Sequence, residues 1–405
     1  MRKINVSNFT LATRTTGREI NRQILLNLVR EHQPISRADL ARRMEVGRPR
    51  VTALVNELMA EGVLCEGEAV ESPRGRRPRM LHVRTRDRLV VAADVRFART
   101  WLMLSDFSGE QIALETFDTL LDPAALTAEL ASRIERILRT YGQGGTCEGI
   151  GIAVPGMVDH LTGRILNAPQ LGWKDVEIRG ALAQATGLPV QIENAPIACA
   201  LSKMWLGQRE GDTGDFVYVT VSEGVGAGVV VNGQVMRGHG HSAGEFGHVP
   251  INPDGPRCLC GATGCWEAHT SNLATLSRYL GRELSPTETR ALLAETPLTV
   301  TDLIMRARTG DEKARDALLT TGRYLGVGLA MIVNSINPSR IFVGGEVTAA
   351  WDLIGPGVRA EIETRALTAS AAATPVIPEQ GVGHPRLRGA CALVAAPTFA
   401  APTVA

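Results

Sequence analysis

The sequence of 405 residues is poor in aromatic side chains, which make up 4% of it, and its 7 cysteines are few and odd in number. It also lacks an apolar run of the 18 or more residues that span a membrane, and its first residues lack the apolar segment of a signal peptide. These absences predict a soluble protein with reduced thiols and a cytoplasmic location. The length predicts two or three domains, and a hydrophobic content of 44% with 42 glycines is typical of an α/β protein.

The charge is nearly balanced overall but is unevenly distributed along the chain. The formal net charge is +1, yet residues 1–90 contain 18 Lys and Arg against 10 Asp and Glu, whereas the remaining 315 contain 25 against 32. A basic end joined to a mildly acidic body predicts that this end meets a polyanion. The alternative is that the basic residues only form a solvated face.

The basic end has the pattern of a helix-turn-helix. A second helix is predicted over Arg37–Met44, started by Ser36 with Asp39 three residues later, and a turn at Glu45–Gly47 separates it from a third helix that contains Pro49 in its first turn. The first and third helices are indicated by apolar residues at helical spacing, namely Ile20, Ile24, Leu25, Leu28 and Val29, and then Val51, Leu54, Val55, Leu58 and Met59. The polar residues on the exposed side of the third helix are the predicted contacts to the DNA major groove: Arg48, Arg50, Thr52 and Asn56.

A wing is predicted after this third helix. Gly62–Leu64 leads into one strand and Leu81–Val83 into a return strand, and the loop between them is rich in arginine and proline. Arginines on a thin, stiff loop suit a narrow minor groove, where the phosphate potential is most negative. We expect Arg74, Arg76 and Arg77 to contact DNA, with a basic interdomain linker as the alternative for this loop.

The residues between Glu245 and Glu267 have the spacing of a metal site. His248, Cys258, Cys260 and Cys265 supply one imidazole and three thiolates, a set suited to tetrahedral Zn²⁺ with a structural role. Free cysteines in a flexible loop are the alternative, and His239, His241 and His269 could compete with His248 as the nitrogen ligand. Folding around zinc would bring both glutamates near one point, where convergent acceptors suit an uncharged polyol such as a sugar.

From residue 87 onward the predicted elements follow the order of an actin-like, ribonuclease-H-like α/β fold. The first half is predicted as strands Leu89–Val95, Thr100–Ser105 and Gln111–Phe117, helix Pro123–Tyr141, strand Glu148–Val154, helix Asp175–Thr186, strand Val190–Glu193 and helix Ala198–Leu206. The second half begins with strands Phe216–Val221 and Gly228–Val231. We expect three domains, a DNA-binding domain at 1–86, a first lobe at 87–197 completed by about 384–405, and a second lobe at 198–383.

The motifs in this part resemble the ROK family (repressor, open reading frame, kinase) over residues 20 to about 396. The zinc signature from Gly247 to Glu267 is matched without a gap, as are Ala243–His248 before it and Ile341–Gly345 on a later strand. The resemblance implies a two-lobed sugar-kinase fold. Because a winged helix precedes it, the chain is similar to the xylose and N-acetylglucosamine repressors of the family.

Two parts of the family's kinase machinery are missing from this sequence. Kinases of the family hold ATP phosphates with a D-x-G-G-T-K hairpin, whereas this chain has Asp94–Arg99 without either glycine. They also carry a catalytic aspartate after an E-N pair, whereas Ala195 follows Glu193 and Asn194 here and cannot act as a base. We therefore expect no enzyme activity and no catalytic residues.

The resemblance also implies which residues bind sugar. Asn194, Glu245, His248 and Glu267 would hydrogen-bond to sugar hydroxyls, and His248 would do so while its other ring nitrogen binds zinc. Capping or support of the metal site remains an alternative for the two glutamates, and a turn role for Asn194. Gln170 stands where asparagine is usual, and Ala195 removes one sugar contact.

These features predict a sugar-responsive, DNA-binding transcriptional regulator, most simply a repressor of carbohydrate genes that acts as a homodimer or tetramer. One alternative is an active ROK sugar kinase with an added DNA-binding domain. Another is a regulator that answers to a protein partner, which the departures at Gln170 and Ala195 favour.

Overall fold

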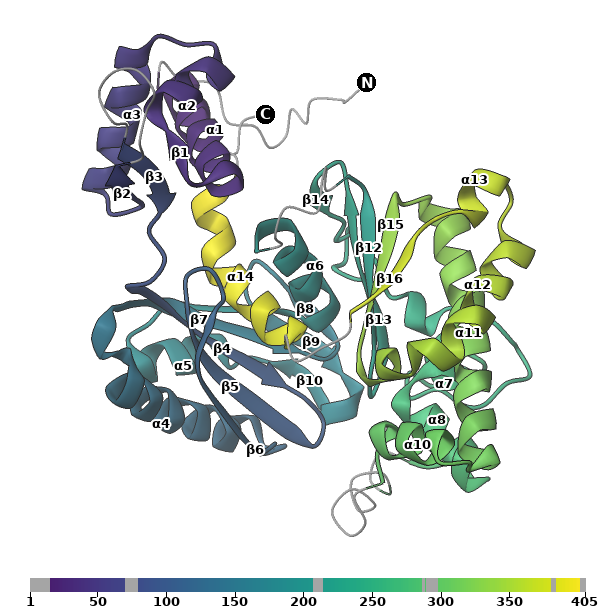
Figure 1. Cartoon of the computed structure of the whole chain (residues 1–405). Helices are drawn as coiled ribbons and strands as arrows, with labels where there is room; N and C mark the ends of the chain where they lie inside the picture. Colours follow the sequence, from purple (N-terminus) through teal and green to yellow (C-terminus); the bar gives the residue numbers. More distant parts are fainter. Residues whose placement is uncertain are drawn as a thin grey trace.

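The computed structural model describes residues 15–69, 79–206, 214–285, 288, 298–379 and 384–400. Three bodies are visible in Figure 1: a small N-terminal body, called the head, and two larger lobes, each built on its own five-stranded sheet. The lobes lie side by side, and helix α14 (Pro385–Phe399), near the end of the chain, runs from the first lobe to the head.

The head consists of three helices and a small sheet. Its elements are α1 (Thr16–His32), β1 (Ile35–Ser36), α2 (Arg37–Met44), α3 (Arg48–Ala60), β2 (Leu64–Ala69) and β3 (Arg79–Val83), with the strands in the order β1-β3-β2. The predicted bounds of α2 are confirmed, and the Ser36 side chain caps the helix by accepting a hydrogen bond from the amide of Asp39.

The buried face of α1 differs from the prediction. Leu25 and Val29 are fully buried, but Ile20 and Ile24 are 36% and 46% exposed, and Leu26 takes their place in the core. Helix α3 is closer to expectation, because four of its five predicted core residues are buried and only Met59 is partly exposed. The helical period was therefore right, while the side of α1 that faces the core was partly wrong.

The first lobe is a mixed sheet in the order β11-β7-β4-β5-β6. The strands β4, β5 and β6 are antiparallel, whereas β7 and β11 run parallel to β4. Its strands are β4 (Arg88–Val95), β5 (Arg99–Asp106), β6 (Gln111–Asp118), β7 (Thr146–Val154) and β11 (Val190–Asn194), and its helices are α4 (Pro123–Tyr141) and α5 (Arg179–Thr186). A small second sheet holds β8 (Met157–Asp159), β9 (Arg164–Ala168) and β10 (Trp173–Val176). Helix α6 (Ala195–Trp205) follows β11 and packs against α14 and against β13 of the second lobe.

Two predicted helices of this lobe can be compared with the structure. The predicted helix Pro123–Tyr141 is confirmed, because Asp122 caps it and Leu126, Leu130, Ile134 and Ile137 form one buried face. The prediction of a helix over Asp175–Thr186 is wrong in its first part. Trp173–Val176 pairs with β9 as a strand, the Trp173 indole donates to the Leu121 carbonyl at 2.6 Å, and the helix starts only at Arg179.

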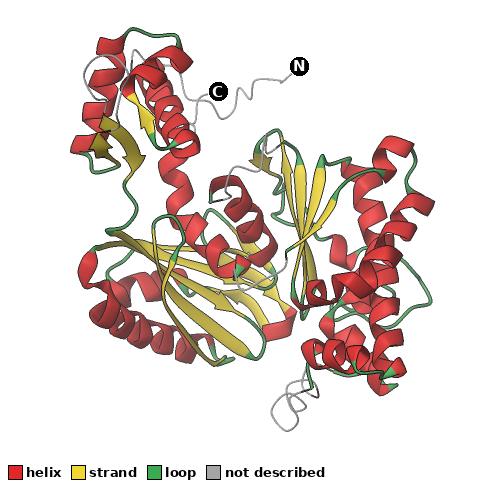
Figure 2. Ribbon diagram, viewed as in Figure 1, coloured by secondary structure: helices red, strands yellow, loops and turns green. Residues whose placement is uncertain are grey.

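The second lobe has the sheet order β14-β13-β12-β15-β16. Its helices gather on the side of this sheet that faces away from the first lobe (Figure 2). The strands are β12 (Phe216–Val221), β13 (Val225–Val231), β14 (Gln234–Val235), β15 (Arg340–Gly344) and β16 (Val376–Pro378), and the helices are α7 (Trp266–Thr270), α8 (Asn272–Leu280), α10 (Val300–Arg308), α11 (Glu312–Ile336), α12 (Trp351–Arg365) and α13 (Ala369–Ala372).

Among the residues described, one helix, α11, is long and apolar enough to cross a membrane by length and composition alone. Its most apolar window has a mean hydropathy of 1.2, and 61% of that window is buried inside the fold. Such burial is typical of a core helix. Trp266 of α7 packs on it, because a side chain at Gly328 would come within 1.9 Å of the indole ring.

Candidate functional site

Four side chains converge at the edge of the second lobe to form a candidate metal site. His248 ends a short 3-10 helix (Phe246–His248), Cys258 and Cys260 lie on the following loop, and Cys265 precedes α7. One ligand atom from each of the four lies within 4.8 Å of all the others. The sulfur of Cys258 is 3.6 Å from Nδ1 of His248, and the sulfurs of Cys260 and Cys265 are 3.7 Å apart.

The loop takes this shape because glycine stands at two tight positions. Gly261 and Gly264 have φ angles of 95° and 70°, which side-chain-bearing residues rarely adopt. A Cβ on Gly264 would also lie 1.5 Å from the Asn252 carbonyl oxygen. These glycines let a short loop turn its three sulfurs toward one point.

The donor set fits a metal ion. Burial raises the pKa of the Cys258 and Cys265 thiols, so a nearby cation is needed to keep them as thiolates at neutral pH. The other three histidines of this region lie elsewhere. His239 is exposed, His269 stacks on Tyr324 with ring centroids 4.2 Å apart, and His241 contacts the first lobe.

His248 connects the metal cluster to the cleft between the lobes. Its Nδ1 faces Cys258, while its Nε2 lies 3.8 Å from a carboxylate oxygen of Glu245. Glu267 is buried beside the cluster, where Oε1 lies 3.7 Å from the Cys258 sulfur and Oε2 accepts a 2.9 Å hydrogen bond from the amide of Val225. Burial raises the pKa of both Glu245 and Glu267.

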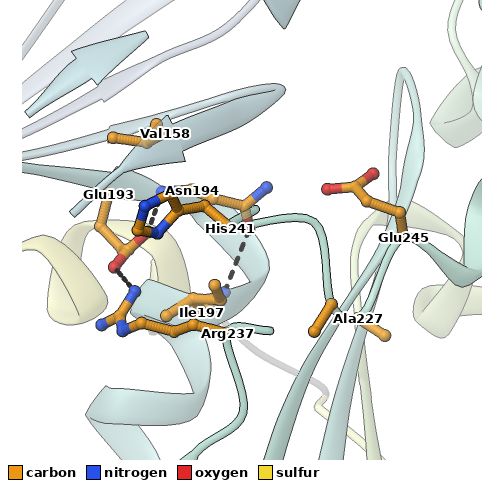
Figure 3. A pocket seen from close by; sticks show the side chains of 9 residues that line it. Val158, Glu193, Asn194, Ile197, Ala227, Arg237, His241 and Glu245 are labelled. Carbon is orange, nitrogen blue, oxygen red and sulfur yellow. Dashed lines mark hydrogen bonds and ion pairs between the residues drawn. The ribbon is translucent and has the colours of Figure 1, made fainter. Parts of the chain in front are cut away.

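A pocket opens between the lobes next to Glu245 (Figure 3). Asn194 and Glu245, two of the four predicted sugar-binding residues, line it. His248 is outside the lining, but its Nε2 lies 3.8 Å from the Glu245 carboxylate. The lining also contains residues that the sequence did not single out as binding residues: Val158, Glu193, Ile197, Ala227, Arg237, His241 and Ala243. Glu193 is buried and forms an ion pair with Arg237. Its place beside Asn194 at the end of a buried strand was the signal that could have found it.

Asn194 has a structural role in addition to its place in the pocket. Its Oδ1 accepts from the amide of Ile197 and so caps α6, and its Nδ2 donates to the Gly156 carbonyl oxygen at 2.7 Å. This is the turn role that the sequence left open. Ala195, which follows it, is buried as the first residue of α6.

Gln170 lies on the first lobe, between β9 and β10, and comes close to Glu267 of the second lobe. A Cβ on Gly224 would come within 2.3 Å of Nε2 of Gln170 and 2.6 Å of Oε2 of Glu267, so the two side chains approach the same turn of the second lobe. That turn joins β12 and β13 at Ser222–Gly224.

The segment that corresponds to the kinase phosphate hairpin is filled by charged side chains. Arg96 lies in the turn between β4 and β5, donates to buried Asp94 at 2.7 Å, and reaches across the cleft to Glu346 at 2.9 Å. Burial alone would lower the pKa of Arg96, but Asp94, Glu223 and Glu346 together raise it. Burial alone would raise the pKa of Glu346, but Arg96 and Asn272 lower it. The guanidinium thus joins the two lobes with its charge compensated.

Helix α6 joins the pocket to the head. It starts next to Asn194 and ends at Trp205, whose carbonyl oxygen accepts a 3.2 Å hydrogen bond from Arg30 of α1. The Arg30 guanidinium also lies over the rings of Trp205 and Phe399, at 4.9 and 5.2 Å from their centroids. Phe399 ends α14, and its carbonyl oxygen accepts from Asn27 of α1 at 2.8 Å.

The predicted DNA contacts are only partly covered by the structure. Arg48, Arg50, Thr52 and Asn56 are all exposed on α3. The first two turns of that helix border a hollow lined by Ser36, Arg37, Ala38, Arg48, Thr52 and Arg79. The wing residues Arg74, Arg76 and Arg77 lie outside the described residues.

The chain matches known proteins over most of its length. The model of the ROK family matches residues 99–396. A xylose repressor of Caldicellulosiruptor bescii is 30% identical over 364 residues, which cover 89% of this chain and 91% of the relative. The DNA-binding transcriptional dual regulator NagC of Escherichia coli is 29% identical over 383 residues, which cover 93% and 92% of the two chains.

Solved structures agree with these relatives. A ROK family transcriptional regulator, a homologue of the Escherichia coli MLC protein, superimposes with a TM-score of 0.77 at 27% identity and covers 95% of this chain and 97% of its own. A ROK family glucokinase from Streptomyces griseus, solved with glucose and AMPPNP, has a TM-score of 0.63 at 26% identity. It covers 75% of this chain and 98% of its own.

Replacing Arg96 by alanine is expected to destabilise the protein by about 3 kcal/mol, because breaking one partner of a buried ion pair leaves the other uncompensated. Glu346 would lose the cation paired with it, and Asp94 would keep only Arg386, whose guanidinium lies 3.6 Å away. The measurement is urea denaturation at neutral pH. Arg99→Ala is the matched control, since that side chain is 56% exposed and lies 3.8 Å from Asp118, and it should cost under about 1 kcal/mol. Equal losses for the two variants would contradict the role given to Arg96.

Proposed function

Because this chain belongs to the ROK family, we propose that it is a sugar-responsive, DNA-binding transcriptional regulator, acting as a repressor of carbohydrate genes. The observation that carries the proposal is the head. A ROK regulator structure aligns with 95% of the chain, whereas a complete ROK glucokinase accounts for only 75% of it. The named relatives with similar full-length coverage, a xylose repressor and NagC, are regulators too.

The head acts as a winged helix-turn-helix. Helix α3 enters the major groove and presents Arg48, Arg50, Thr52 and Asn56, and the loop between β2 and β3 supplies Arg74, Arg76 and Arg77 to the minor groove. The basic charge of residues 1–90 gives the sequence-independent part of the affinity. We place this domain at residues 1–86, in a cytoplasmic homodimer or tetramer whose paired heads read two half-sites.

The lobes act as the sensor. The first lobe covers residues 87–197 with about 384–405, and the second covers 198–383. A sugar or sugar derivative binds in the cleft to Asn194, Glu245, His248 and Glu267. The pocket is also lined by the Glu193–Arg237 ion pair, so these two side chains lie within reach of a bound sugar.

The same lobes do not transfer phosphate. The Arg96 guanidinium occupies the turn that glycines open for nucleotide phosphates in the kinases, and Glu223 adds a negative charge beside it. Ala195 stands in place of the general base. An active sugar kinase is the alternative hypothesis, and a phosphorylation assay tests it.

His248, Cys258, Cys260 and Cys265 would hold Zn²⁺, because three thiolates and one imidazole at close range suit a tetrahedral structural site. Zinc would hold the loop that carries Cys258 and Cys260 against α7, and so fix His248 and Glu267 at the cleft. The ion has no part in chemistry, since four protein ligands leave it no open position.

The DNA proposal predicts that Arg50→Ala weakens binding to the preferred operator by about 1–3 kcal/mol, because a bidentate arginine–guanine contact has this value. Selection from random duplexes identifies the operator, and fluorescence anisotropy measures the affinity of each variant. Arg139→Ala, a 72% exposed arginine on α4, is the matched control and should bind like the wild type. Equal affinity and an equal sequence preference for Arg50→Ala would remove α3 from recognition.

The same anisotropy assay, repeated with a panel of monosaccharides and their phosphates, tests the sensor. At least one member should change the operator affinity, and none should be phosphorylated by ATP in the presence of Mg²⁺. ATP-dependent phosphorylation of any sugar of the panel would support the kinase hypothesis instead. Binding of no sugar, with DNA binding intact, would instead point to control by a protein partner.

The zinc proposal predicts that Cys260→Ser weakens the sulfur-to-metal charge-transfer absorption of the Co²⁺-substituted protein, since Cys258 and Cys265 remain, and lowers the melting temperature. The loss follows because zinc-bound thiolate stabilises only the folded loop. Cys147→Ser is the control, since Cys147 is half-buried on β7, outside the cluster. A wild-type protein that melts at the same temperature after thorough chelation, with no metal left by elemental analysis, would contradict the structural role.

A further inference from the structure

A second group of metal-binding side chains lies at the rim of the pocket and is separate from the cysteine cluster. Asp159 ends β8 of the first lobe, and His160 follows it. His241 comes from the second lobe, on the loop between β14 and the 3-10 helix that carries His248. One ligand atom from each of the three lies within 4.8 Å of the others.

The contacts inside this group are short. Nδ1 of His160 and Nδ1 of His241 are 3.2 Å apart, and Nε2 of His241 lies 3.4 Å from a carboxylate oxygen of Asp159. The imidazole rings meet edge to face, with centroids 5.1 Å apart. Two ring nitrogens at this distance either share one proton or turn toward a common cation.

The backbone holds these residues in place. His241 has a φ of 58°, a left-handed conformation that costs energy in a residue with a side chain and recurs at functional sites. Asp159 is anchored on the other side, because its carboxylate accepts from the amide of Leu161 at 3.0 Å and from the hydroxyl of Thr162 at 2.8 Å. Such second contacts orient a carboxylate that binds metal.

The charges around the group tolerate a cation. Arg237 is a positively charged residue of the pocket lining, and it forms an ion pair with buried Glu193. The side chains of His241 and Asp159 are 24% and 22% exposed, so an ion can enter from solvent while water is partly excluded. Figure 3 shows His241 beside Glu193 and Asn194, with Glu245 across the pocket.

We propose that Asp159, His160 and His241 bind a divalent transition-metal ion between the two lobes. Two imidazoles and one carboxylate suit Zn²⁺, Co²⁺, Ni²⁺ or Cu²⁺, and not Mg²⁺ or Ca²⁺, which require mostly oxygen ligands. Three protein ligands leave coordination positions open for water or another ligand. Because two ligands belong to the first lobe and one to the second, a bound ion favours the arrangement of the lobes in which they meet.

The site stands independently of the proposed regulatory function, since metal binding is measured on the protein alone. The full-length protein is first loaded with Zn²⁺ at the cysteine cluster, freed of excess metal, and then titrated with Co²⁺ by calorimetry and absorption spectroscopy. We expect one additional Co²⁺ per chain, with visible ligand-field bands but no sulfur-to-cobalt charge transfer. The missing charge-transfer band separates this site from the cysteine cluster.

Single variants His160→Asn and His241→Asn should each weaken the additional site by at least about tenfold, because loss of even an outer-shell partner of a metal site has an effect of this size. His239→Asn is the matched control, an exposed histidine two residues away on the same loop, and should bind like the wild type. Circular dichroism and retained zinc at the cysteine cluster verify folding of each variant.

Absence of an additional ion in the wild type would overturn the proposal, as would equal binding by the His160→Asn and His241→Asn variants. Loss of the ion in His239→Asn as well would place it on the exposed loop and would also overturn it. A sulfur-to-cobalt band on the added ion would assign it to the cysteines, with the same consequence.

Discussion

The connection between the cleft and the head depends on the close packing of helices α6 and α14. Gly389 of α14 lies against the backbone of α6, where a Cβ would come within 2.5 Å of the Ala198 carbonyl carbon, and the next residue, Ala390, has its carbonyl oxygen 1.9 Å from the position of a Cβ on Gly151 of β7. Such contacts allow little sliding, because backbone meets backbone without flexible side chains between. At about 1.5 Å per residue, the 11-residue α6 spans roughly 16 Å from Asn194 in the pocket to Trp205 beside the head. A ligand that moves Asn194 must therefore move the surface on which Arg30 and Phe399 dock.

The cleft between the lobes contains a group of paired charged side chains. Arg96 and Glu346 face each other across it, Asp94 is buried beneath them, and Arg386 lies 3.6 Å from Asp94. In a kinase this space needs glycines, so that backbone N–H groups can approach phosphate. Here the ion pairs of Arg96 with Asp94 and Glu346 fill this space instead. The pair with Glu346 also connects the two lobes directly. A sensor needs such a connection, because ligand acts only through a difference in affinity between two arrangements of the lobes.

Local signals in the sequence predicted much of the fold. The bounds of α2 and α4 were right because caps and apolar period agree at Ser36 and Asp122. The error at Asp175–Ile178 arose because Asp175 and Val176 belong to a strand that pairs with β9, and Asp175 adopts a left-handed φ of 59°. Ile20 and Ile24 were assigned to the core by period alone, which does not say which apolar residues of a helix find a partner.

The candidate site divides in the same way. The spacing of the motif alone predicted His248, and not one of three nearby histidines, as the nitrogen ligand of the cysteine cluster. This was possible because the C-x-C spacing and the glycine turns are local features of the sequence. Arg237, His241 and His160 could not be placed, because they meet only when loops from the two lobes come together. The turn preference of Asn194 indicated a local structural role, which is the capping of α6. That α6 runs from the pocket to the head could be found only from the tertiary structure.

We propose that sugar in the cleft and DNA on the head are energetically coupled through α6 and α14. Coupling between two binding sites is reciprocal, so it can be measured from either side. The most direct test is the calorimetric dissociation constant of the effector sugar, measured with free protein and with protein saturated by operator. We expect the two constants to differ by about fivefold or more, the lower range of typical couplings. Identical constants, with both ligands bound at once, would contradict it.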